Sequence, residues 1–398
     1  MKHTVRRLLI PFDYLLLALS FLMPRDKRLW CFGAKFGGNA KYLFIHLNSE
    51  KEMDCGYKYV WIGEEDVQVV QSLGYTAYRR WSIKGIWNCL RAGVYIYNSY
   101  PSNINLYTVG RAKLINLWHG IALKSIDRQI KVGPMVKIYQ SKGLINELRY
   151  LNFRLRPDLV LSTSPTVSND FSEAFGVPVS HCIEGLYPRC ELFMSPLSVV
   201  DEFVDKYENS ATKRLRNQLK QYEYVYVYMP TFRDSGDDFL NNCGFDLDKI
   251  NSVMVKNNRV FLLKLHPDSK LQITKEYSNV IQVAKDVDIY PILPYSHCLV
   301  TDFSSIYFDY LLMEDKQIIL FVPDYDEYIS KSRNLLYNYD EIMKGRKAED
   351  FNQLLSLMSE INPIFEIDGK EQIKNKFWDY KCSNMNELTE SIIKRIDE

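Results

Sequence analysis

Apolar runs of the length of buried strands alternate with amphipathic stretches along most of the chain. In the first half, these runs predict strands at 28–33, 57–62, 94–98, 112–117 and 159–164, with helical periodicity at 39–48, 67–73, 85–92 and 168–175. Strands and helices that alternate at this spacing form βαβ units, in which a parallel sheet is covered on both faces. The first half is therefore predicted to be an α/β domain.

A second series of apolar runs begins after a loop and a charged helical stretch between residues 189 and 220. Strands are expected at 224–229, 259–265, 280–283, 298–301 and 317–321, and helices at 286–293 and 305–312, before a polar helical stretch at 351–397. We therefore predict two open α/β domains in tandem, 28–195 and 196–370, with a cleft between them, and a C-terminal helix at 371–398. In such sheets ligands bind beyond the carboxyl ends of the strands.

The N-terminal segment, 1–27, differs from the rest of the chain. Residues 8–23 read LLIPFDYLLLALSFLM, and the basic residues around them are Lys2, Arg6, Arg7, Arg25, Lys27 and Arg28. This run is shorter than the roughly 20 apolar residues that span a bilayer, and no small-residue cleavage site of a signal peptide follows it. Basic residues on both sides of a short apolar helix favour a position in the membrane interface near anionic lipid. A buried first helix of the domain is the alternative.

The composition narrows the classes of protein that fit. The chain has 398 residues, of which 50 are Lys or Arg and 49 are Asp or Glu, so its formal net charge is +1. A near-neutral total argues against a nucleic-acid binder, which needs a surplus of positive charge. The eight cysteines show no CxxC pair or metal-type spacing, and we expect reduced, buried thiols. Neither a Walker A sequence nor a GxGxxG fingerprint occurs, so no ATP or NAD cofactor is expected.

Two histidines follow predicted strands, one in each domain. His119 comes after the strand that ends at Leu117, and Gly120 gives a flexible turn behind it. His266 follows a strand of the second domain, two residues after Lys264. A histidine at such a place can act as a general base toward a hydroxyl group, and His with Lys can bind a diphosphate through charge-assisted hydrogen bonds. A buried core histidine is the alternative, and neither position has the helical spacing of a zinc site.

Two polar loops after strands of the second domain complete the candidates. The first reads MPTFRDSG at 229–236, and a plain turn with a helix cap is its alternative role. The second reads TDFSS at 301–305 and precedes a predicted helix, where backbone N–H groups and hydroxyls can bind a phosphate. A simple N-cap is the alternative there. The residues that we expect to contact the phosphates or the donor are Thr231, Arg233, Lys264, Thr301, Asp302, Ser304 and Ser305.

Taken together, these segments resemble the CDP-glycerol:poly(glycerophosphate) glycerophosphotransferase family, the TagF and TagB type teichoic acid enzymes and their capsule relatives. The matching segments, in order, are FGGNAKY at 36–42, NLWHGIALK at 116–124, EGLYPR at 184–189, YMPTFRD at 228–234, KLHP at 264–267, and DIYPIL at 288–293 with TDFSS at 301–305. Each segment alone is loose, but their shared order is specific. One departure is that Ile121 and Ala122 replace the usual Thr and Pro after Trp-His-Gly.

The resemblance implies a GT-B fold, with two Rossmann-like domains facing an interdomain cleft, and metal-independent, inverting transfer by a peripheral membrane protein. The first domain would bind the acceptor and the second the CDP-activated donor. His119 would assist attack by the acceptor hydroxyl, and His266 would bind the donor diphosphate together with the serines of 301–305. The residues expected on the acceptor side are Trp118, Gly120 and Lys124.

The resulting prediction is transfer of glycerol phosphate from CDP-glycerol to a hydroxyl of a lipid-linked teichoic acid or capsule polymer, with release of CMP, at the cytoplasmic face of a bacterial cell membrane. A CDP-ribitol donor, or a glycosyltransferase that uses a nucleotide sugar, is the alternative within the same fold. A non-catalytic membrane-bound scaffold of a polymer-export complex is the alternative from another class, and it would tolerate loss of both His119 and His266.

Overall fold

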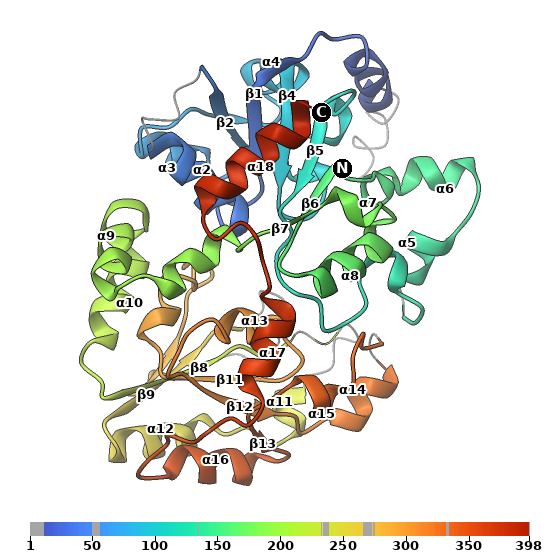
Figure 1. Cartoon of the computed structure of the whole chain (residues 1–398). Coiled ribbons are helices and arrows are strands. Elements are labelled where there is room, and N and C mark those ends of the chain that lie inside the picture. The colour runs from blue at the N-terminus through green and yellow to red at the C-terminus, as the bar shows by residue number, and fades with distance from the viewer. Residues whose placement is uncertain are drawn as a thin grey trace. The chain divides into compact units, whose positions relative to one another are not determined.

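The computed structural model describes residues 12–49, 56–133, 135–231, 233, 239–265, 273, 275–331 and 334–397 (Figure 1). These residues form two compact units. Unit 1 contains the described residues of Met1–His119, Lys137–Arg189 and Trp378–Glu398, and unit 2 contains those of Gly120–Val136 and Cys190–Phe377. Neither unit is one consecutive range. The chain enters unit 2 briefly after His119, and its C-terminal end returns to unit 1.

Unit 1 is built on a seven-stranded sheet in which every pair of neighbouring strands is parallel. Its order is β3-β2-β1-β4-β5-β6-β7. The strands are β1 (Asp26–Gly33), β2 (Lys58–Gly63), β3 (Ala77–Arg79), β4 (Ala92–Tyr97), β5 (Lys113–Asn116), β6 (Leu159–Ser162) and β7 (Cys182–Glu184). All six residues of β4 are buried, which accounts for its uninterrupted sequence AGVYIY.

Unit 2 contains a six-stranded parallel sheet of order β10-β9-β8-β11-β12-β13. The strands are β8 (Tyr224–Tyr228), β9 (Arg259–Leu263), β10 (Val280–Gln282), β11 (Cys298–Thr301), β12 (Gln317–Phe321) and β13 (Arg346–Ala348). When the strands of each unit are numbered from its own first strand, both sheets contain the order 3-2-1-4-5-6 of the doubly wound dinucleotide-binding fold, and unit 1 adds a seventh strand at its edge. The predicted α/β class with parallel sheets is thus confirmed.

Helices connect the strands of both units. In unit 1 they are α2 (Gly38–Ser49), α3 (Val67–Ser72), α4 (Ile83–Arg91), α5 (Val136–Gln140), α6 (Leu144–Arg149), α7 (Leu151–Arg154), α8 (Pro165–Phe175) and α18 (Met385–Asp397). In unit 2 they are α9 (Leu197–Tyr207), α10 (Ser210–Leu219), α11 (Phe239–Asn242), α12 (Leu247–Lys256), α13 (Ile306–Tyr310), α14 (Tyr325–Lys331), α15 (Tyr339–Ile342), α16 (Phe351–Ser359) and α17 (Lys370–Phe377).

Local sequence signals explain where α8 begins and ends. The Ser164 side chain accepts a hydrogen bond from the Val167 N–H, and Pro165 occupies the first helical turn. Gly176 ends the helix in the left-handed conformation, with φ of 64°.

The predicted helix at 286–293 is wrong. The structure has turns there and a 3-10 helix at Leu293–Tyr295. Pro291 lies inside the predicted helix and Pro294 follows it, and each lacks the N–H that a helix interior requires.

The helical part of the N-terminal segment, 12–20, belongs to unit 1 and is tied to it by Arg25. The Arg25 guanidinium donates to five backbone carbonyls, those of Ser20, Cys89, Ala92, Thr108 and Gly110. Burial lowers the pKa of Arg25 from its ordinary value. Arg25 therefore does not serve as the free basic flank that the sequence suggested. Across the described ranges, no helix is both long and apolar enough to cross a bilayer.

The seven cysteines that the structure describes are free thiols, and all of them are buried or half-buried. They are Cys31, Cys89, Cys182, Cys190, Cys243, Cys298 and Cys382. The expectation of reduced, buried thiols is confirmed for these residues.

Candidate active site

Most of the predicted site residues that the structure describes lie where the two parallel sheets reverse their strand order. In unit 1 the reversal falls between β1 and β4, and in unit 2 it falls between β8 and β11. Loops at such switch points diverge to opposite sides of the sheet and leave a crevice at the carboxyl ends of the strands. The polar motifs after β1, β4 and β5 belong to the first of these places, and those after β8, β11 and β12 to the second.

In unit 1, the turn after β5 holds Trp118 in a left-handed conformation. Its φ is 50°, which is uncommon for a bulky residue, and φ of Gly120 is 143°. The Trp118 ring is buried and packs edge-on against Phe175 and Phe171, at centroid distances of 4.9 and 6.2 Å. Strained backbone that packing maintains is common at functional sites. The turn aims the next side chain, His119, toward solvent.

Three polar side chains hold this turn, and two of them come from distant parts of the chain. Asn39, fully buried at the start of α2, donates from Nδ2 to the carbonyls of Leu117 and Trp118, both at 3.0 Å. Asn116 accepts from the Trp118 N–H at 2.9 Å. Arg189 donates from Nη2 to the His119 carbonyl at 2.9 Å. Segments 36–42, 116–124 and 184–189, which looked like separate motifs in the sequence, therefore meet at one turn.

The His119 ring lies against the Trp118 ring, with centroids 4.1 Å apart. Its Nδ1 is 3.1 Å from the carbonyl oxygen of Asn98 and 3.2 Å from Ser99 Oγ. Both partners follow β4 directly. Lys124, expected on the acceptor side, lies in unit 2, where it pairs with Leu335 in an isolated antiparallel bridge.

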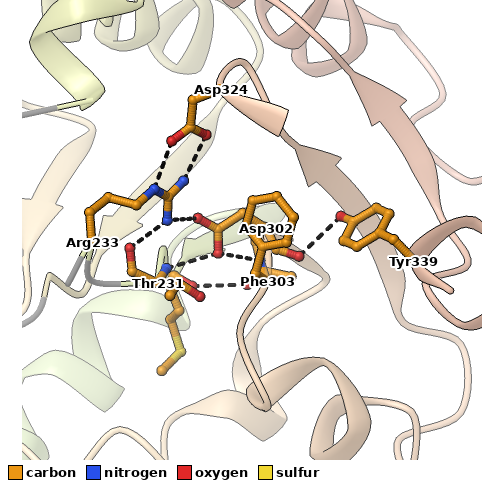
Figure 2. Close-up of polar contacts among 8 residues, drawn as sticks. Thr231, Arg233, Asp302, Phe303, Asp324 and Tyr339 are labelled. Atoms are coloured by element: carbon orange, nitrogen blue, oxygen red, sulfur yellow. Dashed lines mark hydrogen bonds and ion pairs between the residues drawn. The ribbon is translucent and has the colours of Figure 1, made fainter. Parts of the chain in front are cut away.

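In unit 2, Arg233 and two aspartates form a buried ion-pair cluster, which we call the Arg233 clamp (Figure 2). Arg233 Nη1 donates to Asp302 Oδ2 at 2.7 Å, while Nε and Nη2 donate to the two oxygens of Asp324 at 2.7 and 2.8 Å. Asp302 Oδ1 accepts from the N–H groups of Thr231 and Phe303, at 2.8 and 2.6 Å. The clamp thus joins the loops after β8, β11 and β12.

Aromatic rings surround the guanidinium of the clamp. Its central carbon is 3.8 Å from the Phe239 ring centroid, 4.8 Å from that of Tyr328 and 5.6 Å from that of Phe303. Burial opposes its charge, yet the Asp302 and Asp324 carboxylates raise the pKa of Arg233 above its ordinary value. Arg233 was expected to contact a phosphate. The structure instead shows its charge neutralised by two carboxylates, and it gives Asp302 a defined role in holding the loops.

The other predicted donor residues occupy the same edge of the sheet in unit 2. Thr301 donates from its hydroxyl to the Met229 carbonyl at 2.9 Å. Lys264 donates from Nζ to the carbonyls of Ala284 and Val287, at 2.8 and 3.0 Å. Ser305 occupies the N-cap position of α13 without a side-chain capping hydrogen bond.

His266 and Pro267 lie outside the described residues. Ser304 and Ser305 are half-buried. The Thr231 hydroxyl oxygen is buried and has no hydrogen-bond partner among the described residues.

A cavity of about 580 Å³ adjoins the clamp. Its lining includes two basic side chains, Arg233 and Lys347, and four acidic ones, Asp324, Asp326, Glu327 and Glu349. Arg233 is paired as described, and Lys347 lies 3.2 Å from Glu349. This lining is net acidic and would repel a diphosphate. The loop at 301–305, which we call the serine loop, is therefore the better candidate for binding it.

Sequence reasoning missed Asn98, Asn39, Arg189 and Asp324 as site residues. Asn98 ends a predicted strand, Asn39 and Arg189 fall inside the quoted motifs, and Asp324 follows β12 closely. The sequence could have marked these residues only by their positions just beyond strands, because their hydrogen-bond partners are far away in the sequence. Among the described residues, no group of three His, Cys, Asp or Glu side chains is arranged to hold a metal ion.

The chain is similar to known proteins over nearly its whole length. The profile of the family described as CDP-Glycerol:Poly(glycerophosphate) glycerophosphotransferase matches residues 16–392. A teichoic acid glycerol-phosphate transferase of Staphylococcus aureus is 25% identical over 375 residues, which are 91% of this chain and 90% of the relative. A teichoic acid poly(ribitol-phosphate) polymerase of Bacillus spizizenii is 26% identical over 282 residues, which are 69% of this chain but 42% of the relative.

Solved structures show the same fold. A variant of the wall teichoic acid polymerase TagF superposes with a TM-score of 0.73 at 21% identity, over 99% of this chain and 95% of that chain. The UDP-GlcNAc 2-epimerase of Methanocaldococcus jannaschii, in complex with UDP-GlcNAc and UDP, superposes with a TM-score of 0.51 at 10% identity, over 92% and 98%. These likenesses support a GT-B-like fold with two Rossmann-like units.

Proposed function

The chain belongs to the CDP-glycerol:poly(glycerophosphate) glycerophosphotransferase family, and we propose that it transfers glycerol phosphate from CDP-glycerol to a hydroxyl of a surface polymer, with release of CMP. Its relatives form teichoic acid polyol phosphates, with glycerol in some enzymes and ribitol in others. The observation that carries the proposal is the strained Trp118 turn, which the polar side chains of Asn39, Asn116 and Arg189 hold and which presents His119 to solvent.

Glycerol is favoured as the polyol by the extent of the similarity. The glycerol-phosphate transferase of Staphylococcus aureus is matched over 90% of its length, and a poly(glycerol phosphate) polymerase of Bacillus spizizenii over 85%. A ribitol-phosphate primase and a ribitol-phosphate polymerase of Bacillus spizizenii are matched over 65% and 42% of their length, although several other glycerol-phosphate enzymes are also matched over less than half of theirs. A TagF variant was also solved after soaking with CDPG. CDP-ribitol stays the second candidate donor.

The proposed reaction is a single displacement at phosphorus. His119 takes the proton of the acceptor hydroxyl as the oxygen attacks the β-phosphorus of CDP-glycerol. The new P–O bond forms while the bond between the β-phosphorus and the bridging oxygen breaks, and CMP leaves with the electron pair. Negative charge grows on the phosphoryl oxygens and the leaving group, so preorganised hydrogen-bond donors stabilise this transition state.

Unit 2 would supply those donors. The Ser304 and Ser305 hydroxyls and nearby N–H groups are proposed to bind the diphosphate, because Ser305 does not use its hydroxyl as a helix cap. The buried, unpartnered Thr231 hydroxyl is a further candidate donor. His266 is proposed to bind the same diphosphate on the basis of the resemblance. We assign the clamp a positioning role, since it joins the loops that carry these groups.

We also propose that unit 1 attaches to an anionic membrane surface. Phe12, Leu15 and Leu19 follow one face of the N-terminal helix and are 49–63% exposed. Tyr14, on the same helix, donates to the Leu148 carbonyl of α6 at 2.6 Å. On α6 itself, the residues Leu144 and Ile145 are about three-quarters exposed. Lys142 and Arg149, beside and on α6, are exposed basic residues. An apolar surface next to basic residues suits the interfacial region of a bilayer.

The activity is tested by mixing the purified protein with a lipid-linked acceptor in EDTA and following CMP release. CDP-glycerol, CDP-ribitol and a nucleotide sugar are supplied in separate reactions. We expect turnover with CDP-glycerol and a loss of about 10²- to 10⁴-fold in His119→Ala, the usual contribution of general-base catalysis. His46→Ala is the matched control, because His46 bonds Asn386 on α18 and does not take part in the reaction. Turnover with CDP-ribitol alone would overturn the choice of polyol.

Membrane attachment is tested by co-sedimentation with phosphatidylglycerol vesicles and with phosphatidylcholine vesicles. We expect the protein to pellet with the anionic vesicles, and we expect the double variant Leu15→Asp/Leu19→Asp to stay in the supernatant. Val255→Asp is the control, because Val255 is 52% exposed on α12 of unit 2. Equal loss of binding in the control would contradict the assignment of this surface.

A further inference from the structure

The hydrogen-bond partner of His119 Nδ1 fixes where the ring carries its proton. The carbonyl oxygen of Asn98, 3.1 Å away, can only accept a hydrogen bond. Nδ1 must therefore donate, and in the neutral ring the lone pair then lies on Nε2. Ser99 Oγ, 3.2 Å from Nδ1, can accept as well, so it does not oppose this tautomer. A general base needs its lone pair on the nitrogen that faces the hydroxyl, which makes the accepting carbonyl part of the chemistry.

The side chain of Asn98 holds that carbonyl in place. Its Nδ2 donates to the Gly37 carbonyl at 2.9 Å, and its Oδ1 accepts from the Ala40 N–H at 2.8 Å. Gly37 lies in the turn between β1 and α2, and Ala40 lies in the first turn of α2, across the switch point from β4. Gly38 has φ of 62°, and a Cβ atom there would lie 2.8 Å from Asn98 Nδ2. The turn therefore closes tightly around one amide.

The same peptide group is held from its other end. The N–H of Ser99 belongs to the peptide that carries the Asn98 carbonyl, and it donates to Asn103 Oδ1 at 3.1 Å. With the side chain of residue 98 and the N–H of residue 99 both fixed, the carbonyl has little freedom to rotate away from His119. A water molecule in place of this carbonyl would not favour the tautomer with the proton on Nδ1, because water can donate as well as accept.

We propose that Asn98 is a positioning residue, whose locked side chain keeps its own carbonyl against His119 Nδ1 and so keeps the Nε2 lone pair available for the acceptor hydroxyl. This inference rests on the proposed function for its catalytic consequence, but the tautomer itself is a property of unit 1. Asparagine suits the position because both hydrogen bonds need one donor and one acceptor on the same planar group. Alanine removes both bonds, whereas aspartate keeps the acceptor for Ala40 and loses the donor to Gly37.

The test is nitrogen NMR of the full chain labelled with ¹⁵N-histidine. The chain has six histidines, and the His119 signals are identified by their loss in His119→Ala. We expect the wild type to show protonated Nδ1 and unprotonated Nε2 above the pH at which the ring loses its charge. In Asn98→Ala we expect a mixture of both tautomers, and in Asn98→Asp a weaker preference than in the wild type. Protonated Nε2 in the wild type would overturn the proposal, with no variant required.

Kinetics of the same variants complete the test. We expect kcat of Asn98→Ala to fall about 10- to 100-fold, as misplaced catalytic groups do, with little change in the KM for the donor. Asn169→Ala is the matched control, because Asn169 also donates from Nδ2 to a backbone carbonyl in unit 1, that of Pro165, but lies outside the turn. An unchanged tautomer in Asn98→Ala would refute the positioning role even if activity fell. Absence of CMP release with every donor, together with the expected tautomer, would count against the proposed function and leave this inference standing.

Discussion

The two units share a strand order but hold their switch points with different chemistry. In unit 1, the neutral amides of Asn39, Asn98 and Asn116, together with the Arg189 guanidinium, bind backbone groups of the loops after β1, β4 and β5. In unit 2, the Arg233 clamp joins the loops after β8, β11 and β12 through charged groups. Because the side chains of unit 1 bind backbone groups, His119 is left as an exposed titratable ring at this switch point. The charges of the clamp are buried and paired with one another, so they support the structure and do not face a ligand.

This difference bears on where phosphate binding can arise. The clamp combines one guanidinium with two carboxylates, and its formal charge is therefore negative. A diphosphate near it would be attracted by N–H and hydroxyl groups rather than by Arg233. For this reason we place donor binding on the serine loop and treat the clamp as its support. Three sets of variants test this difference between the two units.

The largest effect is expected from removal of the cation in unit 2. Arg233→Met leaves Asp302 and Asp324 buried without a positive partner, which costs about 3–5 kcal/mol for a buried pair. Urea unfolding with hydrogen exchange should show the loss in unit 2, and activity should fall because the loops after β8 and β11 separate. Arg214→Met, an exposed arginine of α10, is the control and should unfold like the wild type. Equal unfolding free energies for the two variants would show that the clamp does not stabilise unit 2.

A smaller effect is expected from removal of one neutral tie in unit 1. Asn39→Ala leaves the carbonyls of Leu117 and Trp118 without this donor, at a cost of about 1–3 kcal/mol for buried polar groups. We expect kcat to fall as well, since the strained turn carries His119. The control is Asn48→Ala, in the last turn of the same helix, where Nδ2 donates to the Phe44 carbonyl. If both variants lost activity equally, α2 as a whole rather than the tie at Asn39 would be responsible.

The smallest effect concerns pH. Burial, followed by the nearby charge of Lys316, lowers the pKa of His297 in unit 2 from its ordinary value of 6.5. Nδ1 of this ring accepts from the Val225 N–H at 3.1 Å, so the folded state holds it neutral. Below pH 6.5 the unfolded chain binds a proton that the folded chain does not, and the free energy of unfolding must decrease as the pH falls.

The measurement is urea unfolding of the wild type and of His297→Gln between pH 7 and 5. The wild type should lose stability toward pH 5, and the variant should show a flatter dependence. An identical slope in both proteins would assign the acid sensitivity to other groups.

The sequence was most informative about buried strands and least informative about ties between loops. Runs such as VYIYN and RVFLLKL predicted β4 and β9 because both faces of a parallel sheet are apolar. The edge strands β3, β7 and β13 were missed, since three residues show too little periodicity, whereas the equally short edge strand β10 was predicted. His119 was found because it follows a strand. Its supporting residues were not, because the bonds of Asn39 and Asn98 connect positions 58, 78 and 150 residues apart.

The return of the C-terminus to unit 1 has a consequence for synthesis on the ribosome. In Figure 1, α18 is the red helix among the blue and cyan elements of unit 1, and it buries Leu388 and Ile392 there. Just before it, Cys382 pairs with the edge strand through hydrogen bonds to Glu184 and Leu186. All residues of unit 2 have been translated before these last residues emerge. Domains usually fold in the order of their synthesis, but here the unit that begins the chain is the last to be completed.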